Sequence, residues 1–186
     1  MNLQHVNVKL FVEGELSTNL DDIVKVFHRW VSEQSLPEMM IDVADYQHVP
    51  AGPSVLLVGL EADYSIDYAR NRCGMRYNRK GVLEGSNADQ FRNAFACAGN
   101  VCSQLEAEFD GLRFSRCEFL VTVNDRAIAP NNDETRAAFQ RELESWLRED
   151  LGQNEFSLEL ETDPRQLVGA MVKLVTNAEL PTLTRA

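Results

Sequence analysis

The chain has 186 residues, of which 44% are hydrophobic and 25% are charged, and its formal net charge is −11. This balance is ordinary for a globular protein and excludes a largely disordered chain. A surface that binds nucleic acid or an anionic membrane needs a local excess of lysine and arginine, and acidic residues flank the densest basic stretch, 70–80. We therefore expect a protein that binds neither nucleic acid nor a membrane.

The first half of the chain predicts a strand, a helix and three further extended runs. Hydrophobic and polar residues alternate over 6–13, which is the period of a half-buried strand. Asn19 or Thr18 caps a helix that reaches about Gln34, and Pro37 prevents it from continuing. The three apolar runs that follow are 39–44, 55–68 and 73–80.

The last two of these runs predict a hairpin whose register can be assigned. A turn at 69–72 places Tyr64 opposite Tyr77 and Ile66 opposite Met75, which makes one face apolar. A slip of one residue would destroy this pattern. We expect the apolar face to turn inward under the helices. The other face then points outward, or into a cleft that covers it, and carries Glu61, Asp63, Ser65 and Asp67 opposite Lys80, Asn78 and Arg76.

The second half of the chain predicts helices and strands in alternation. These are a helix from about 87 to 109, a strand over 114–124, a helix from about 132 to 152, a strand over 156–160 and a last helix that Asp163 caps and Pro164 begins. The resulting order, β-α-β-β-β-α-β-α-β-α, predicts a single-domain α+β fold with a mixed β-sheet and helices mainly on one face. We expect an ordered core over about 5–176 and a C-terminal tail over 177–186.

The sequence contains no pattern typical of a cofactor or metal site. Its four cysteines form no Cys-x-x-Cys pair, and no Walker, Gly-x-Gly-x-x-Gly or His-Glu-x-x-His pattern occurs. We therefore expect no cofactor and no bound metal. The first residues lack the basic start and the apolar run of a signal peptide, and no stretch reaches the roughly 18 apolar residues of a membrane span. We expect a cytoplasmic protein with reduced thiols.

The segment 41–67 contains most of the side chains that could act as acid, base or metal ligand. Asp42, Asp45 and His48 are the candidate catalytic residues in it. A hairpin closed by 47–54 would place Asp42 opposite about Gly59 and the other two at the far end. One metal could not then bind all of them, and the alternative is a solvated, salt-bridged strand face.

Asp42 stands out because it interrupts the apolar run MMIDVA. A buried carboxylate needs a partner, so Asp42 either lies in a functional pocket or forms a structural pair with Arg29 or Lys80. His28, at the edge of the apolar stripe of the first helix, is a further candidate catalytic residue, and its alternative role is packing.

Asn124, Asp125 and Arg126 are the candidate ligand-binding residues. They lie in the loop between a strand and the start of a helix, where free backbone amides favour a small anion. The alternative is a turn in which Asp125 and neighbouring asparagines accept hydrogen bonds from the loop itself.

Three segments together resemble a bacterial protein family. They are FHRW at 27–30, IDVADYQHVPAGP at 41–53 and VNDRAIAPNNDET at 123–135. The resemblance covers most of the chain as one domain and implies a bacterial, cytoplasmic setting. That family has no assigned activity, so the resemblance implies no catalytic residue.

Two hypotheses for the function remain. The first is a non-enzymatic cytoplasmic binding or interaction module, because catalytic motifs are missing and the chain is acidic. Its partner would be another protein or a second copy of the chain, bound through an edge strand or through the tyrosines of the hairpin. The second is a small hydrolase or transferase that uses Asp42, Asp45 and His48, with or without a metal.

Overall fold

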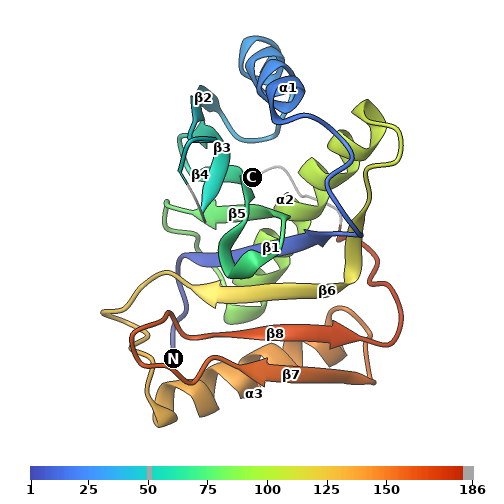
Figure 1. Cartoon of the computed structure of the whole chain (residues 1–186). Coiled ribbons are helices and arrows are strands. Elements are labelled where there is room, and N and C mark those ends of the chain that lie inside the picture. Colours follow the sequence, from blue (N-terminus) through green and yellow to red (C-terminus); the bar gives the residue numbers. More distant parts are fainter. Residues whose placement is uncertain (50–51, 182–186) are drawn as a thin grey trace.

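The computed structural model of the chain describes residues 1–49 and 52–181, and in them it shows eight strands and three α-helices (Figure 1). In chain order these are β1 (Val6–Val12), α1 (Leu20–Glu33), β2 (Met40–Asp45), β3 (Pro53–Gly59), β4 (Ala62–Asp67), β5 (Gly74–Arg79), α2 (Asn87–Glu108), β6 (Phe114–Val123), α3 (Asp133–Glu149), β7 (Phe156–Leu160) and β8 (Gly169–Leu174).

The strands form one sheet in the order β2-β3-β4-β5-β1-β6-β8-β7. All pairings between these described strands are antiparallel. The first strand of the chain therefore lies in the middle of the sheet, between β5 and β6. Residues on both faces of this central strand are covered, and all seven residues of β1 are buried.

The helices cover one face of the sheet. α2 packs against β1, β5 and β6, α1 against β2 and β3, and α3 against α2 and β8. In the view of Figure 1, α2 and α3 lie behind the sheet. The face turned away from them is called the open face below. None of the helices in the described ranges combines the length and the apolar character that a membrane crossing requires.

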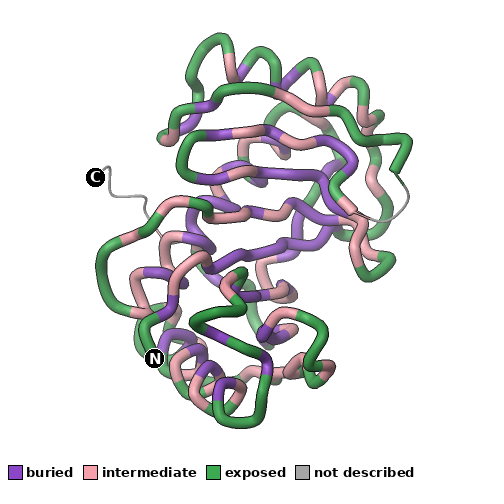
Figure 2. The backbone as a smooth tube through the Cα atoms, turned by 90° about the vertical axis from the view of Figure 1, so that its left-hand side faces the viewer, coloured by how far each residue is buried: buried purple, intermediate pink, exposed green. Residues whose placement is uncertain are grey.

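Aromatic side chains join the helices to the sheet. Phe95 of α2 contacts Phe119 of β6 and Trp146 of α3, with ring centroids 4.9 and 5.7 Å apart, and Phe91 contacts Trp146 at 5.5 Å. The buried segments run along the central strands and the inner sides of the helices (Figure 2). The fold is thus the α+β class that the order of elements predicts, with one hydrophobic core.

The predicted register of the β4–β5 hairpin is confirmed. Tyr64 lies opposite Tyr77 and Ile66 opposite Met75, and the rings of the two tyrosines are 5.2 Å apart. All four side chains are at most 1% exposed. On the open face, the strand register contains two of the predicted pairs, Asp63 with Asn78 and Ser65 with Arg76.

The run 55–68, predicted as one strand, is two strands. Leu60 and Glu61 turn the chain back between β3 and β4, so the meander has one more strand than expected. Gly59 permits this turn, because a Cβ on it would lie only 2.4 Å from the backbone oxygen of Ala62. The strong apolar pattern of the run concealed the turn.

The last predicted helix is wrong. Asp163 and Pro164 begin only a short turn, and the segment after it is β8, which pairs with β6 and β7. Ala170, Val172 and Leu174 are buried at a period of two, which is the period of a strand. The sheet is also antiparallel throughout the described strands rather than mixed, because this element returns as a strand.

Both ends of the predicted ordered core extend further than expected. Leu3 is fully buried, and its N–H donates to Asn87. At the other end, Ala178 is 5% exposed and donates its N–H to the Arg116 carbonyl, so the described part of the expected tail is packed on the domain. Residues 182–186 of that tail lie outside the described residues.

Candidate functional site

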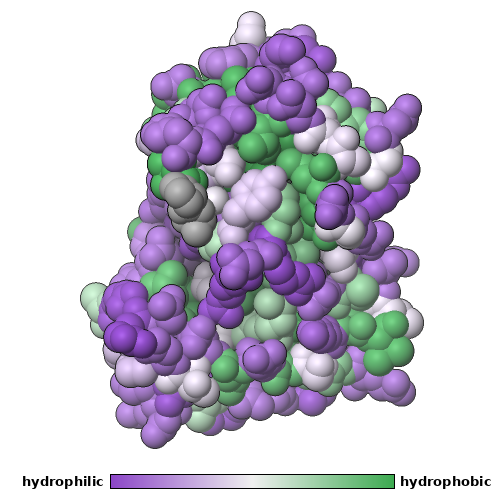
Figure 3. All heavy atoms as spheres, in the orientation of Figure 1, coloured by the Kyte–Doolittle hydropathy of each residue, from purple (hydrophilic) through white to green (hydrophobic). Residues whose placement is uncertain are grey.

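A cavity of about 250 Å³ opens on the open face, over the centre of the sheet. This size is just below the ~300–1,000 Å³ of most small-molecule sites, and it suits a small ligand rather than a polymer. We call it the central pocket. Figure 3 shows hydrophilic side chains gathered over the middle of this face, with hydrophobic ones among and around them. The pocket is lined by Asn7, Val8, Lys9, Phe11, Asp67, Ala69, Arg70, Arg76, Leu120, Thr122, Gln166 and Leu167.

Strand pairing places two cations side by side on the floor of the pocket. Lys9 of β1 lies opposite Arg76 of β5 and, on its other side, opposite Leu120 of β6. Directly opposite residues point to the same face of a sheet, and like charges in that position destabilise it. Asp67 compensates, because its carboxylate forms ion pairs with Lys9 at 2.7 Å and with Arg76 at 3.7 Å.

Lys9 is buried, and its amine is fully hydrogen-bonded within the protein. It is 3% exposed, and its Nζ donates to Asp67 Oδ1 at 2.7 Å, to the Ala69 carbonyl at 3.0 Å and to the Arg72 carbonyl at 2.7 Å. These three acceptors use all three N–H bonds of an ammonium group. Burial lowers the pKa of Lys9, and the hydrogen bond with Asp67 opposes this effect. Gly74 provides the space, since a Cβ on it would lie 2.9 Å from Lys9 Cε.

The loop 68–72 covers part of the central pocket, and we call it the cover loop. Two of its residues, Arg70 and Asn71, have φ angles of 62° and 56°, a left-handed conformation that is uncommon outside glycine. Such a backbone persists where its surroundings hold it. Lys9 donates to two carbonyls of the loop, those of Ala69 and Arg72. The guanidinium of Arg72 also forms a bidentate pair with Glu118 of β6, with both distances 2.9 Å. The cover loop is therefore tied down across the sheet.

Arg76 is the cation of the pocket with the fewest interactions. Among the described residues its charged partner is Asp67, at 3.7 Å, which is beyond hydrogen-bond distance. By contrast, Arg70 pairs with Glu161 at 2.5 Å, and Lys9 has three acceptors. Lys9, Arg70 and Arg76 line the pocket with Asp67, and Glu161 is paired to Arg70, so this group of side chains has a formal charge of +1 in a chain of net charge −11. This favours a small anion.

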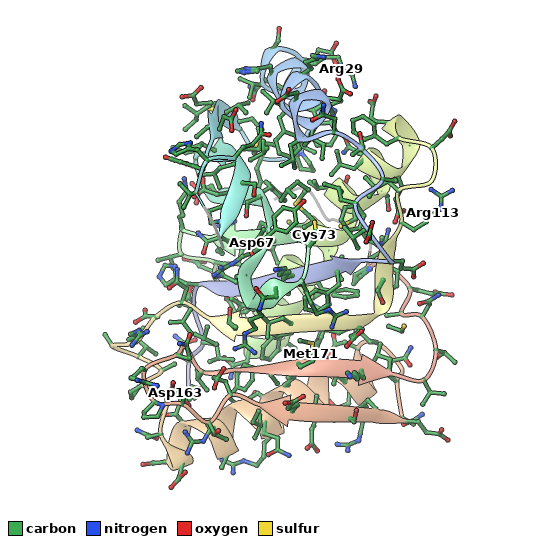
Figure 4. All side chains as sticks on the ribbon, in the orientation of Figure 1. Arg29, Asp67, Cys73, Arg113, Asp163 and Met171 are labelled. Carbon is green, nitrogen blue, oxygen red and sulfur yellow. The ribbon has the colours of Figure 1, made fainter. Side chains whose placement is uncertain are left out.

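The remaining lining residues suit a ligand with both polar and apolar parts. Asn7, Thr122 and Gln166 bring hydrogen-bonding side chains, whereas Phe11 and Leu167 bring apolar ones. Figure 4 shows Asp67 and Cys73 near the middle of the open face. Burial raises the pKa of the Cys73 thiol, so the thiolate needed for nucleophilic attack is disfavoured there.

A second buried polar cluster lies on the helix side of β4 and β5. Glu38 accepts hydrogen bonds from Tyr64 at 2.9 Å, Tyr77 at 3.2 Å and Arg79 at 3.3 Å. Burial raises the pKa of Glu38, against the effect of these donors. The cluster fixes the connection between α1 and β2 to the sheet. Because both tyrosines are buried, they offer no surface to a second copy of the chain.

The candidate catalytic residues of the segment 41–67 lie away from the central pocket. Asp42, Asp45 and His48 are all exposed. A bulge after Met40 shifts Asp42 to a position opposite Val58, rather than opposite Gly59 as expected. Within the described ranges, no group of three His, Cys, Asp or Glu side chains is placed to hold a metal ion.

The partners expected for Asp42 are engaged elsewhere. Arg29 forms an ion pair with Glu108, and Lys80 forms one with Asp63 at 2.7 Å. The expectation of a buried pair is therefore wrong, because Asp42 is in solvent at the edge of the sheet. His28, the remaining candidate catalyst, is also exposed, on the outer side of α1.

The candidate ligand-binding loop has the geometry of a self-bonded turn. Asp125 Oδ1 accepts the N–H groups of Ala127 at 3.1 Å and Ile128 at 3.0 Å. Arg126 donates to a backbone carbonyl of the connection between β7 and β8, and Asn124 donates to Asn78. These side chains are occupied within the protein and do not line the central pocket.

The four cysteines are free thiols; Cys97 and Cys102 are buried, and Cys73 and Cys117 are partly exposed. Burial raises the pKa of Cys97 to about 12 and that of Cys102 above its usual range.

Comparison with models of protein families, with curated proteins and with solved structures finds no match to this chain.

Proposed function

We propose that the protein is a non-enzymatic binding module that takes a small anionic ligand into the central pocket. One observation carries this proposal: a cationic pocket on the open face of an otherwise acidic protein, lined by Arg76, whose charged partner among residues 1–49 and 52–181 is no closer than 3.7 Å. A guanidinium binds carboxylate or phosphate oxygens through two parallel hydrogen bonds, which gives both strength and orientation.

The chemistry of the pocket favours binding over catalysis. The amine of Lys9 is fully engaged, so it is not an activated nucleophile. Cys73 does not line the pocket, and its thiol has a raised pKa. The exposed positions of Asp42, Asp45 and His48 do not favour the hydrolase or transferase hypothesis.

A titration with a matched pair of probes tests the proposal. Butyrate and butyramide have similar shapes, but only butyrate is an anion. We expect butyrate to shift the backbone amide NMR signals of β1, β5 and β6 around the pocket, and butyramide to leave them largely unchanged.

The Arg76→Gln variant then tests the residue. A hydrogen bond to a charged group contributes about 1.5–3 kcal/mol, so we expect binding of butyrate to weaken by about tenfold or more. Arg113→Gln is the control, because it makes the same change of charge at the margin of the sheet (Figure 4). Equal shifts by the two probes, or unchanged binding in Arg76→Gln, would refute the proposal.

A further inference from the structure

β2 is an edge strand, and among the described strands it pairs only with β3. An edge strand normally presents unpaired backbone groups to which another strand can add. In an antiparallel pair, alternate residues turn their N–H and C=O groups toward the partner. Tyr46 donates its N–H to the Ser54 carbonyl, so Val43 and Asp45, at odd steps from Tyr46, turn theirs away from β3.

The bulge between Met40 and Asp42 reverses this alternation, so the backbone groups of Met40 also turn away from β3, and Gln34 occupies them. Its side-chain amide donates to the Met40 carbonyl at 2.8 Å and accepts the Met40 N–H at 3.2 Å. This is the two-bond pattern that a neighbouring strand would supply. Gln34 ends α1 in a left-handed conformation with φ 49°, where glycine is the usual residue. Glycine would relieve the backbone but could not make this clamp.

Carboxylates occupy two further amides along this edge. Val43 donates its N–H to Asp42 Oδ1 at 2.8 Å, and Gln47 donates its N–H to Asp45 Oδ1 at 2.9 Å. Both aspartates are exposed. Two copies that met at this edge would bring four carboxylates together on two short strands, which is unfavourable. Asp42, the charged residue in the apolar run MMIDVA, thus occupies an outward amide of the edge strand.

We propose that Gln34, Asp42 and Asp45 seal the β2 edge, and that their removal turns it into a site for strand addition by a second copy of the chain. A second copy is the occupant because it brings an identical strand with open backbone groups. Exposed apolar side chains beside the edge, Met39 and Ile41 at 61% and 53%, would be buried by the added strand.

The test compares self-association of the wild type with that of a Gln34→Gly/Asp42→Val variant. Glycine suits the left-handed position and valine suits a strand, so the variant keeps the fold. We expect the wild type to stay monomeric in sedimentation experiments over a range of concentrations, and the variant to form dimers at concentrations at least about tenfold below the highest at which the wild type is still monomeric. Glu15→Val, an equal change of charge in an exposed turn, is the control.

Hydrogen exchange of single amides provides a second readout that does not depend on association. We expect the amides of Met40 and Val43 to be protected in the wild type, and that of Val43 to lose protection in Asp42→Ala. A double variant that stays as dispersed as the wild type, a wild type that dimerises through β2, or fast exchange at Val43 in the wild type would each overturn the proposal.

Discussion

The buried ion pair between Lys9 and Asp67 allows a quantitative test of the central pocket. Lys9→Met removes three hydrogen bonds, and the carboxylate of Asp67, which is only 2% exposed, loses its closest cationic partner. Breaking a buried pair by removing one partner costs about 3–5 kcal/mol. Arg76 is 3.7 Å from the same carboxylate and remains, so we expect a loss near the lower end, about 3 kcal/mol.

The assay is equilibrium unfolding in urea, followed by the fluorescence of the two buried tryptophans, Trp30 and Trp146. Two variants control the interpretation. Lys25→Met removes an ion pair of the same length, 2.7 Å, in solvent, so its midpoint should not change measurably. Lys9→Met/Asp67→Asn should be more stable than Lys9→Met, because it leaves no unpaired buried charge.

A loss below about 1 kcal/mol in Lys9→Met would refute the reasoning, since it would show that the pair contributes no more than a surface contact. So would a double variant less stable than the single one. An unchanged dependence of the free energy on urea concentration is needed to attribute the loss to the native state.

Two further predictions concern the β4–β5 hairpin and its polar cluster. Tyr64→Ala should lose about 3–5 kcal/mol of unfolding free energy. Asp63→Ala, which removes a partly exposed ion pair with Lys80 on the open face, should lose no more than about 1 kcal/mol, and equal losses in urea unfolding would contradict the packing described for this hairpin. Burial raises the pKa of Glu38 in the folded state, so its contribution to stability is complete below the unfolded pKa of about 4.3 and is lost as pH rises through the higher folded pKa. In Glu38→Gln this part of the pH dependence should disappear from unfolding curves recorded across that range; if it persists, Glu38 is not its source.

Local patterns in the sequence predict the elements well, and contacts between distant elements much less. The hairpin register was predictable because Tyr64 and Tyr77 belong to neighbouring strands joined by a short turn, so one slip would expose the apolar face. The last strand was missed because Met171 and Leu174 also fit the spacing of a helix, and only pairing with β6 selects the strand.

The central pocket could not be predicted, because it depends on the order of the strands. Lys9 alternates with Val8 and Leu10 as any residue on a solvated face would, and nothing local shows that β1 lies between β5 and β6. Asp67 and Arg76 were assigned to one face, but without Lys9 they indicate only an ordinary surface pair. The candidates Asp42 and Asp45 attracted attention through the acidic composition of the segment 41–67, whereas the structure places both on the edge strand β2.

The central position of β1 has a consequence for how the chain folds during synthesis. Val6 pairs with Val123, so roughly 115 further residues must be made before the first strand has both neighbours. At about 5–20 residues per second this takes on the order of 6–23 s. During that time a largely apolar strand, with Asn7 and Lys9 as its polar residues, is exposed with an open edge outside the ribosome. Such non-local pairing slows folding, and the nascent chain would be most prone to aggregation before β6 is complete.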